Sequence, residues 1–315
     1  MSNYHHEKRI GSARYRSVAL LAYPRRRDYI RHLIRRLDHV PQILPVSFSA
    51  TARTRGMHCR NMAAIAAKIK LGAHEAGLRR SLTTAAMVHD IGHAAHGHAA
   101  ERAINEWIGE NVFSNDQHSS RVLYFHSPRE RFAVPMFSTP AFPSLPDLSY
   151  VRSSSAMAPI SSLGVIPTVK SETLEFLDDL ENTVGDCGDL MRNGLGQVKV
   201  FYQDLCPKAK KGFAIEHGVD LALELMHRFG FDGSYRSFES LAAPTSEVRR
   251  LMQMARTSVH MLRMQSKLIQ HHDADAHDQT LDMCEWASTL RLYDGVVDRQ
   301  WVVDVVSAID IEAVK

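Results

Sequence analysis

The amino-acid sequence predicts an all-α fold. Apolar residues recur at helical spacing in several separate segments, strong helix formers are frequent, and strand candidates are few and short. The 315 residues include 44% hydrophobic and 23% charged side chains, an ordinary globular composition that argues against disorder along the whole chain. Four scattered cysteines without a CxxC pair suit neither a disulfide framework nor a thiolate zinc site.

The expected helices follow one another along much of the chain. Residues 62–69 (MAAIAAKI) are rich in strong helix formers, above all Ala. Five further segments carry apolar residues at helical spacing, namely 82–90, 99–108, 221–226, 248–268 and 301–314. The best strand candidate is the short segment 198–202.

Two segments interrupt the helical pattern. Residues 127–167 hold seven of the twelve prolines, and proline removes a backbone donor and breaks helices. We expect a long loop here, either partly mobile or an ordered lid. The His- and Asp-rich residues 271–278 are also expected in a loop, with their histidines at the surface rather than on a metal.

The first 60 residues are strongly basic. They contain 13 Lys and Arg against three acids, an excess of ten positive charges, whereas the whole chain has a net charge of only +3. Such an excess attracts phosphate on a nucleotide or on nucleic acid, and a solvated basic face is the alternative. The sequence has no apolar run of about 18 residues, and residues 1–17 lack an apolar core. We therefore expect a cytoplasmic protein with neither a membrane span nor a secretory signal.

The strongest local motif is the segment 89–101, HDIGHAAHGHAAE, which follows a helical run. His89 and Asp90 are adjacent and can both lean toward one ion beside a helix, and His93 follows one turn later. His58, on a separate expected helix, is a candidate third ligand. Imidazole and carboxylate ligands suit Mn, Mg, Fe, Co, Ni or Zn, depending on geometry. A His-rich helix with surface imidazoles is the alternative interpretation.

Phosphate chemistry fits these side chains. A bound cation lowers the pKa of water and screens charge on phosphoryl oxygens. Arginine binds phosphate oxygens through two parallel hydrogen bonds, and a histidine near the metal can transfer a proton to a leaving oxygen.

Several segments resemble the deoxynucleoside triphosphate triphosphohydrolases (dGTPase-like proteins) of the HD-domain superfamily. Residues 53–58 (RTRGMH) are similar to that family's RTRLTH, and residues 89–101 to its HDIGHxPFGHxGE, with histidine in place of its phenylalanine at position 96. Weaker similarities occur at 27–43, 113–123 and 295–299.

A further stretch of the family, YADRIAYxxHDxxDAxRxG, lies over residues 176–194 without a gap. The resemblance implies that Asp178 is a metal ligand and that Asp186 accepts a hydrogen bond from the sugar 3′-hydroxyl. Asn182 stands where the family has a tyrosine that packs on the deoxyribose. Positions 178, 182 and 186 share one face of a helix, so all three can face one pocket. An acidic solvated helix is the alternative.

The resemblance also implies a role for each of the other matched side chains. The expected ligands of one divalent metal ion are His58, His89, Asp90 and Asp178. Arg55 is expected to bind phosphate and His93 to lie beside the phosphates. His98 and Glu101 are expected to be the catalytic acid/base pair, and Gln42 a sugar contact.

The implied protein is a single HD-type hydrolase domain over residues 1–315. Its helical core is expected at about 25–195 and its C-terminal helical extension at 196–315. The implied activity is metal-dependent hydrolysis of deoxynucleoside triphosphates to deoxynucleoside and inorganic triphosphate by a homo-oligomer. Two alternatives stay open: an HD-type nucleotidase or phosphodiesterase for another phosphate ester, and a non-catalytic protein that binds nucleotides, or nucleic acid through its basic N-terminal segment.

Overall fold

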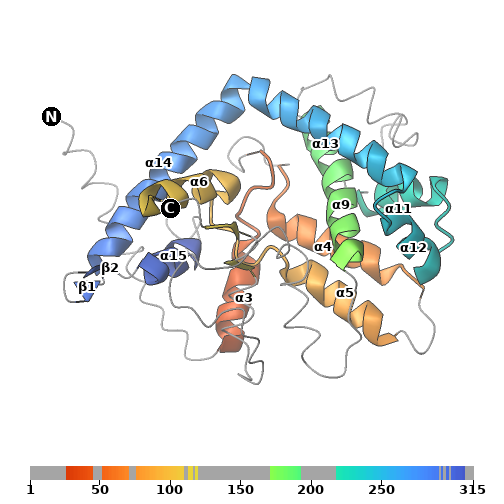
Figure 1. Cartoon of the computed structure of the whole chain (residues 1–315), viewed down its shortest axis with the longest axis horizontal. Coiled ribbons are helices and arrows are strands. Elements are labelled where there is room, and N and C mark those ends of the chain that lie inside the picture. Colours follow the sequence, from red (N-terminus) through yellow and green to blue (C-terminus); the bar gives the residue numbers. More distant parts are fainter. Residues whose placement is uncertain are drawn as a thin grey trace. The chain divides into compact units, whose positions relative to one another are not determined.

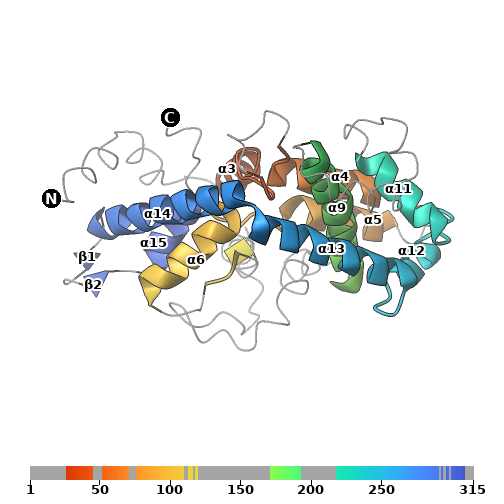
Figure 2. The same cartoon turned by 90° about the horizontal axis from the view of Figure 1, so that it is seen from above.

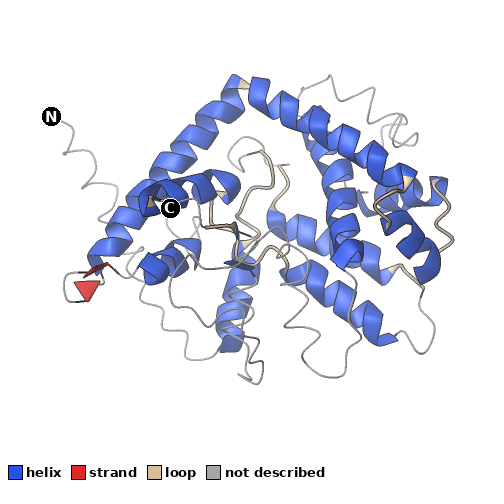
Figure 3. Cartoon of the chain, viewed as in Figure 1, coloured by secondary structure: helices blue, strands red, loops and turns tan. Residues whose placement is uncertain are grey.

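The computed structural model describes residues 26–44, 52–70, 76–109, 113–115, 118–119, 171–192, 218–290, 292–293, 296–297 and 299–308. Within these ranges the chain is helical apart from short loops and one pair of two-residue strands (Figure 3). The prediction of an all-α fold is confirmed. The expected loop 127–167 and the strand candidate 198–202 lie outside the described residues. No helix in the described ranges is both long and apolar enough to cross a membrane.

The chain divides into two compact units, each assembled from segments that are distant in the sequence. The first unit combines Met1–Pro41, Asp90–Arg152 and His271–Lys315, and the second combines Gln42–His89 and Ser153–Gln270. The division between His89 and Asp90 falls inside the histidine motif. The expected single domain over residues 1–315 stays a prediction.

The second unit is built around helix α9 (Ser171–Arg192), which is green in Figures 1 and 2. α9 contacts five helices of the same unit: α4 (Arg55–Ala67), α5 (Ala76–Val88), α11 (Gly218–Arg228), α12 (Tyr235–Ala242) and α13 (Glu247–Gln265). The apolar side chains of Phe176, Leu177 and Leu180 on α9 are fully buried. The ring of Phe176 packs edge-on against Phe238 of α12, with the ring centroids 5.5 Å apart.

Side-chain caps fix where three of these helices begin. Thr54 precedes α4 in an extended conformation, and its hydroxyl accepts a hydrogen bond from the backbone N–H of Met57 at 3.2 Å. Ser234 and Ser246 cap α12 and α13 in the same way. Such caps satisfy backbone N–H groups that have no partner within the helix. The cap at Thr54 therefore fixes the register of the first turn of α4, which carries His58.

The first unit contains α3 (Arg26–Arg36), α6 (Gly97–Ile108), α15 (Arg299–Ala308), the part of α14 (Lys267–Leu290) from residue 271 onward, and the antiparallel strands β1 (Leu292–Tyr293) and β2 (Val296–Val297). One buried apolar cluster joins three of these helices. It includes Ile104 of α6, Cys284 of α14 and Val302 of α15. Burial of these faces holds the short helices of this unit together.

The prediction of a loop at residues 271–278 is wrong, because this segment lies within helix α14. Partly buried positions recur at helical spacing at 272–273 and 276–277, and all of residues 280–284 are partly or fully buried. Histidine, aspartate and alanine occupy most of the earlier positions, so apolar periodicity did not reveal the helix.

Buried polar contacts fix the turn that follows Asp90. The guanidinium of Arg36, which is fully buried, donates hydrogen bonds to the carbonyl oxygens of Ile91, at 3.3 Å, and His93. The N–H of Gly92 donates to the hydroxyl of Ser119 at 2.9 Å. A Cβ atom at position 92 would lie 2.1 Å from the backbone nitrogen of Ser119, so only glycine fits.

We predict that Phe238→Ala lowers the free energy of unfolding by about 3–5 kcal/mol, because it removes a fully buried ring from the core around α9. Urea unfolding followed by circular dichroism measures this change. Met254→Ala is the control, since this side chain is 56% exposed, and it is expected to change the free energy by less than about 0.5 kcal/mol. Equal effects of the two substitutions would contradict the described core.

Candidate metal centre

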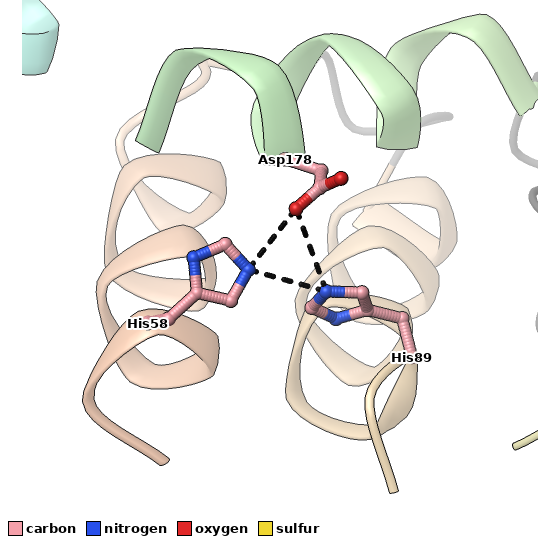
Figure 4. A group of neighbouring side chains, drawn as sticks. All are labelled: His58, His89 and Asp178. Atoms are coloured by element: carbon pink, nitrogen blue, oxygen red, sulfur yellow. Dashed lines mark hydrogen bonds and ion pairs between the residues drawn. The ribbon is translucent and has the colours of Figure 1, made fainter. Parts of the chain in front are cut away.

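Three side chains from separate segments of the second unit converge at one point (Figure 4). His58 lies on α4, Asp178 lies on α9, and His89 follows the end of α5 at Val88 rather than lying within a helix that continues to Asp90. Nε2 of His58 is 3.2 Å from Nε2 of His89 and 3.1 Å from Oδ1 of Asp178. The third side of this triangle, from His89 to Asp178, measures 3.8 Å.

The triangle has the size of one face of a metal coordination shell. Ligand atoms about 2.1 Å from a common ion lie about 3.0–3.4 Å apart at octahedral or tetrahedral angles. Two of the three measured distances fall in that range, and two imidazoles with one carboxylate are a donor set that divalent first-row metals accept. The residues present therefore fit a divalent cation.

The second ring nitrogen of each histidine is held by a hydrogen bond. Nδ1 of His58 contacts the carboxylate of Glu181, and Nδ1 of His89 lies 2.9 Å from the carbonyl oxygen of Ala86. When Nδ1 donates its hydrogen to these oxygens, Nε2 of a neutral ring presents its lone pair. When both rings are neutral, two such lone pairs face each other across 3.2 Å and repel, and a shared cation would satisfy both.

The electrostatic environment of the site favours a cation. Burial by itself lowers the pKa of His58, but the carboxylates of Glu181 and Asp178 outweigh burial and raise this pKa to about 10. Burial raises the pKa of Asp178, but the neighbouring imidazoles of His58 and His89 more than compensate and hold it well below its usual value. The negative charges of Glu181 and Asp178 thus both stabilise positive charge at the buried imidazole of His58.

Arg53 and Glu181 are two residues of this site that the sequence reasoning missed. Arg53 is only 1% exposed, and its Nη2 lies 2.6 Å from Oε2 of Glu181. Its Nη1 lies 3.4 Å from Oδ1 of Asp186, and its backbone nitrogen lies 3.4 Å from Oδ2 of Asp189. One signal was present in the sequence, because Glu181 lies three residues after Asp178 and therefore near it on the surface of the helix.

The predicted sugar contacts lie in two different settings. Asp186 is buried beside Arg53; burial, together with nearby carboxylates, raises its pKa to about 6, although Arg53 opposes the shift. Gln42 donates from Nε2 to Oδ1 of Asn182 at 2.6 Å, and Asn182 donates from Nδ2 to Oδ1 of Asp178 at 2.8 Å. A chain of amides thus connects Gln42 to the triad of His58, His89 and Asp178. The substrate roles of these residues stay predictions.

The other predicted site residues of the histidine motif belong to the first unit. Asp90 is buried, with Oδ1 3.2 Å from Nδ1 of His93. Nδ1 of His98 lies 2.8 Å from Oε2 of Glu101, so this predicted pair is in contact. Asn115 donates from Nδ2 to the same carboxylate at 3.1 Å and thereby orients it. The roles of these residues stay predictions.

The basic N-terminal segment contains buried arginines. Arg36, Arg53 and Arg55 are at most 5% exposed, so these three do not belong to a solvated basic face. Arg55 is the first residue of α4, one turn before His58. Residues 1–25 lie outside the described residues.

Comparison with known proteins identifies the histidine motif. Residues 55–127 match the family model of the HD domain. This segment of the chain is therefore similar to the HD domain. HD domains bind divalent metals, and His58, His89 and Asp90 lie in the matched segment of this chain. Asp178 lies outside it.

The chain is also similar to several curated relatives, each described as a deoxyguanosinetriphosphate triphosphohydrolase-like protein. The relative from Geobacter sulfurreducens is 27% identical over 243 residues, covering 70% of this chain and 56% of that protein. The relative from Geobacter metallireducens is 29% identical over 55% of this chain and 46% of its own length. A relative from Bradyrhizobium sp. is 38% identical over 32% of this chain and 26% of its own length. The resemblance inferred from the motifs is confirmed. The chain spans about half the length of the first two relatives.

His96 departs from the family's motif, which has phenylalanine at this position. The residue immediately precedes α6 and makes no capping hydrogen bond. Its Nε2 is buried and has no hydrogen-bond partner among the described residues. Burial lowers the pKa of His96 from 6.5 to about 4, so the imidazole is neutral in the folded protein at neutral pH.

We predict that His96 makes the HD domain sensitive to acid. Its pKa in the folded protein lies below the value of 6.5 for an unfolded chain, so the unfolded state gains a proton first as the pH falls from 6.5 to 4. This linkage lowers the free energy of unfolding by up to about 3 kcal/mol over that interval. Urea unfolding at several pH values is expected to show a correspondingly smaller loss for His96→Phe. His260→Phe, at an exposed position, is the control and should retain the wild-type pH dependence.

Proposed function

We propose that this HD-domain chain is a metal-dependent phosphohydrolase that converts deoxynucleoside triphosphates to deoxynucleosides and inorganic triphosphate. One observation carries the proposal. Asp178 comes from a helix outside the segment matched by the family model, yet its Oδ1 lies within 3.8 Å of Nε2 of both His58 and His89. The similarity to curated relatives described as deoxyguanosinetriphosphate triphosphohydrolase-like proteins supports the choice of substrate class.

His58, His89, Asp90 and Asp178 are the proposed ligands of one divalent cation. Such a cation supplies Lewis-acid stabilisation of phosphoryl oxygens and lowers the pKa of bound water. Arg55 and His93 are proposed to neutralise phosphate charge, because guanidinium and imidazole groups both donate hydrogen bonds to phosphate oxygens.

His98 is proposed to protonate the leaving 5′-oxygen. Its side chain is 55% exposed and its Nδ1 is held by Glu101, so Nε2 is left to face a ligand. Glu101 is in turn fixed by the amide of Asn115. This arrangement allows the imidazole to hold a proton at one nitrogen while a carboxylate stabilises its charged form. Gln42, Asn182 and Asp186 are proposed to contact the sugar.

Product analysis tests the proposal against an HD-type nucleotidase or phosphodiesterase. The metal-loaded protein is incubated separately with the four deoxynucleoside and four ribonucleoside triphosphates, and the products are separated by anion-exchange chromatography. Release of nucleoside and inorganic triphosphate supports the proposed reaction. Release of orthophosphate supports the alternative, and binding without any product indicates a nucleotide-binding protein.

We predict that Asp178→Asn abolishes metal binding and hydrolysis, because an amide retains the shape of the carboxylate but not its charge. Losing one preorganised charge at a phosphoryl-transfer site costs at least about 100-fold in rate. Titration calorimetry with Mn²⁺ and a triphosphate-release assay measure the two effects.

Asp179→Asn is the matched control for this substitution. Asp179 is the next residue on α9, but its carboxylate pairs with Arg256 of α13 instead of pointing at the triad. We expect this variant to keep metal binding and activity. Full hydrolysis by the Asp178→Asn variant would contradict the assigned ligand set.

A further inference from the structure

Two departures from the family's motif lie four residues apart on α9. In the ungapped overlay of residues 176–194, Glu181 stands where the family's stretch has alanine, and Gly185 stands where it has histidine. Residues four apart lie on the same face of a helix. The two changes therefore alter one patch of α9, adding a carboxylate at one end and removing a side chain at the other.

The guanidinium of Arg53 occupies the space beside Gly185. A Cβ atom at position 185 would lie 1.4 Å from Nη1 and 1.9 Å from Cζ of Arg53. Both distances are far inside van der Waals contact, so any side chain at this position displaces the guanidinium. From its present position Arg53 reaches Glu181 at 2.6 Å. Gly185 thus permits the pairing of Arg53 with Glu181.

The carboxylate of Glu181 is shared between the guanidinium and the triad. Oε2 contacts both Nη2 of Arg53 and Nδ1 of His58, and Oε1 accepts a hydrogen bond from Nδ2 of Asn61 at 2.9 Å. An ionised carboxylate only accepts hydrogen bonds. The ring of His58 must therefore carry a hydrogen on Nδ1, and a neutral ring of this form directs the lone pair of Nε2 at Asp178 and His89.

We infer that Arg53, Glu181 and Gly185 form a positioning unit that fixes the tautomer and orientation of His58 for metal binding. The inference rests on the metal site proposed above. The three residues act through His58 rather than on the substrate. In this chain the carboxylate of Glu181 and the open space beside Gly185 occur together, which distinguishes it from the overlaid stretch.

Metal affinity tests the role of Glu181 without reference to hydrolysis. Titration calorimetry with Zn²⁺ compares the full chain with Glu181→Leu and Glu181→Gln. Outer-shell partners of a metal ligand typically contribute about 10- to 100-fold in affinity, and we expect a loss of this size for Glu181→Leu. Glu181→Gln keeps an acceptor oxygen for Nδ1 and should recover part of that loss. Asp179→Asn removes a neighbouring carboxylate of α9 and should bind as the wild type does.

The tautomer of His58 provides a readout that a merely structural role would not change. In Zn²⁺-loaded protein labelled with ¹⁵N-histidine, NMR is expected to show His58 with its hydrogen on Nδ1, protected from exchange with solvent. Glu181→Leu should lose that protection. A folded Glu181→Leu variant with wild-type zinc affinity and a protected Nδ1 hydrogen would overturn the inference.

A double-mutant cycle tests the role of Gly185. Gly185→Ala displaces the guanidinium and is expected to weaken zinc binding about as much as Arg53→Ala does. Once Arg53→Ala has removed the guanidinium, Gly185→Ala should cause little further loss, because the conflicting atoms are gone. Additive losses would overturn the proposed link between the two residues. If Arg53→Ala does not fold, the zinc affinity of Gly185→Ala is compared with that of the two Glu181 variants. A loss similar to that of Glu181→Leu supports the inference, and wild-type affinity of Gly185→Ala contradicts it.

The outcomes separate this inference from the proposed function. Wild-type protein that binds zinc but releases no triphosphate from any nucleotide contradicts the proposed reaction and leaves the positioning unit intact. Triphosphate release together with zinc affinity that is insensitive to Glu181 contradicts the positioning unit alone. Wild-type protein that binds no divalent metal contradicts both.

Discussion

The burial of four carboxylates on one helix is the constraint on which the second unit depends. These side chains, each at most 9% exposed, all lie on α9: Asp178, Glu181, Asp186 and Asp189. A buried carboxylate costs several kcal/mol unless it is paired and hydrogen-bonded. Arg53 contacts three of them and His58 contacts two. Because α9 also packs against five other helices, the packing of the unit and the pairing of these charges are inseparable.

The hydrogen bonds and ion pairs that stabilise the buried carboxylates of α9 also orient the side chains of the triad toward a common point. Glu181 and Ala86 hold the outer nitrogen of each imidazole, and Asp178 supplies a negative charge beside the inner ones. The site is therefore rigid because its supporting atoms are buried and hydrogen-bonded, and it is electrostatically suited to a metal because carboxylates outnumber cations near His58.

The departures from the family's motifs leave the metal donors in place and change their surroundings. Asn182 substitutes an amide for an aromatic ring, and it connects Gln42 to Asp178 through two hydrogen bonds. His96 substitutes an imidazole for phenylalanine and leaves a buried nitrogen without a partner in the described part of the chain. These two departures therefore change the side chains around the triad and leave His58, His89 and Asp178 themselves in place.

The sequence by itself determined the helical class and nominated the three side chains of the triad. Helical periodicity and propensity are local properties, and the motifs around His58, His89 and Asp178 are short or ungapped, so each could be recognised without the fold. Polar residues hid the helix at residues 271–278, since apolar periodicity is the signal on which that recognition relies.

Only the tertiary structure decided how the triad is supported. Arg53 and Glu181 are 128 residues apart in the chain, and nothing in either local sequence specifies that they meet. The role of Gly185 is visible only because Arg53 lies against it. Buried charges must find partners wherever packing places them, so their pairing depends on the whole arrangement of helices rather than on any segment.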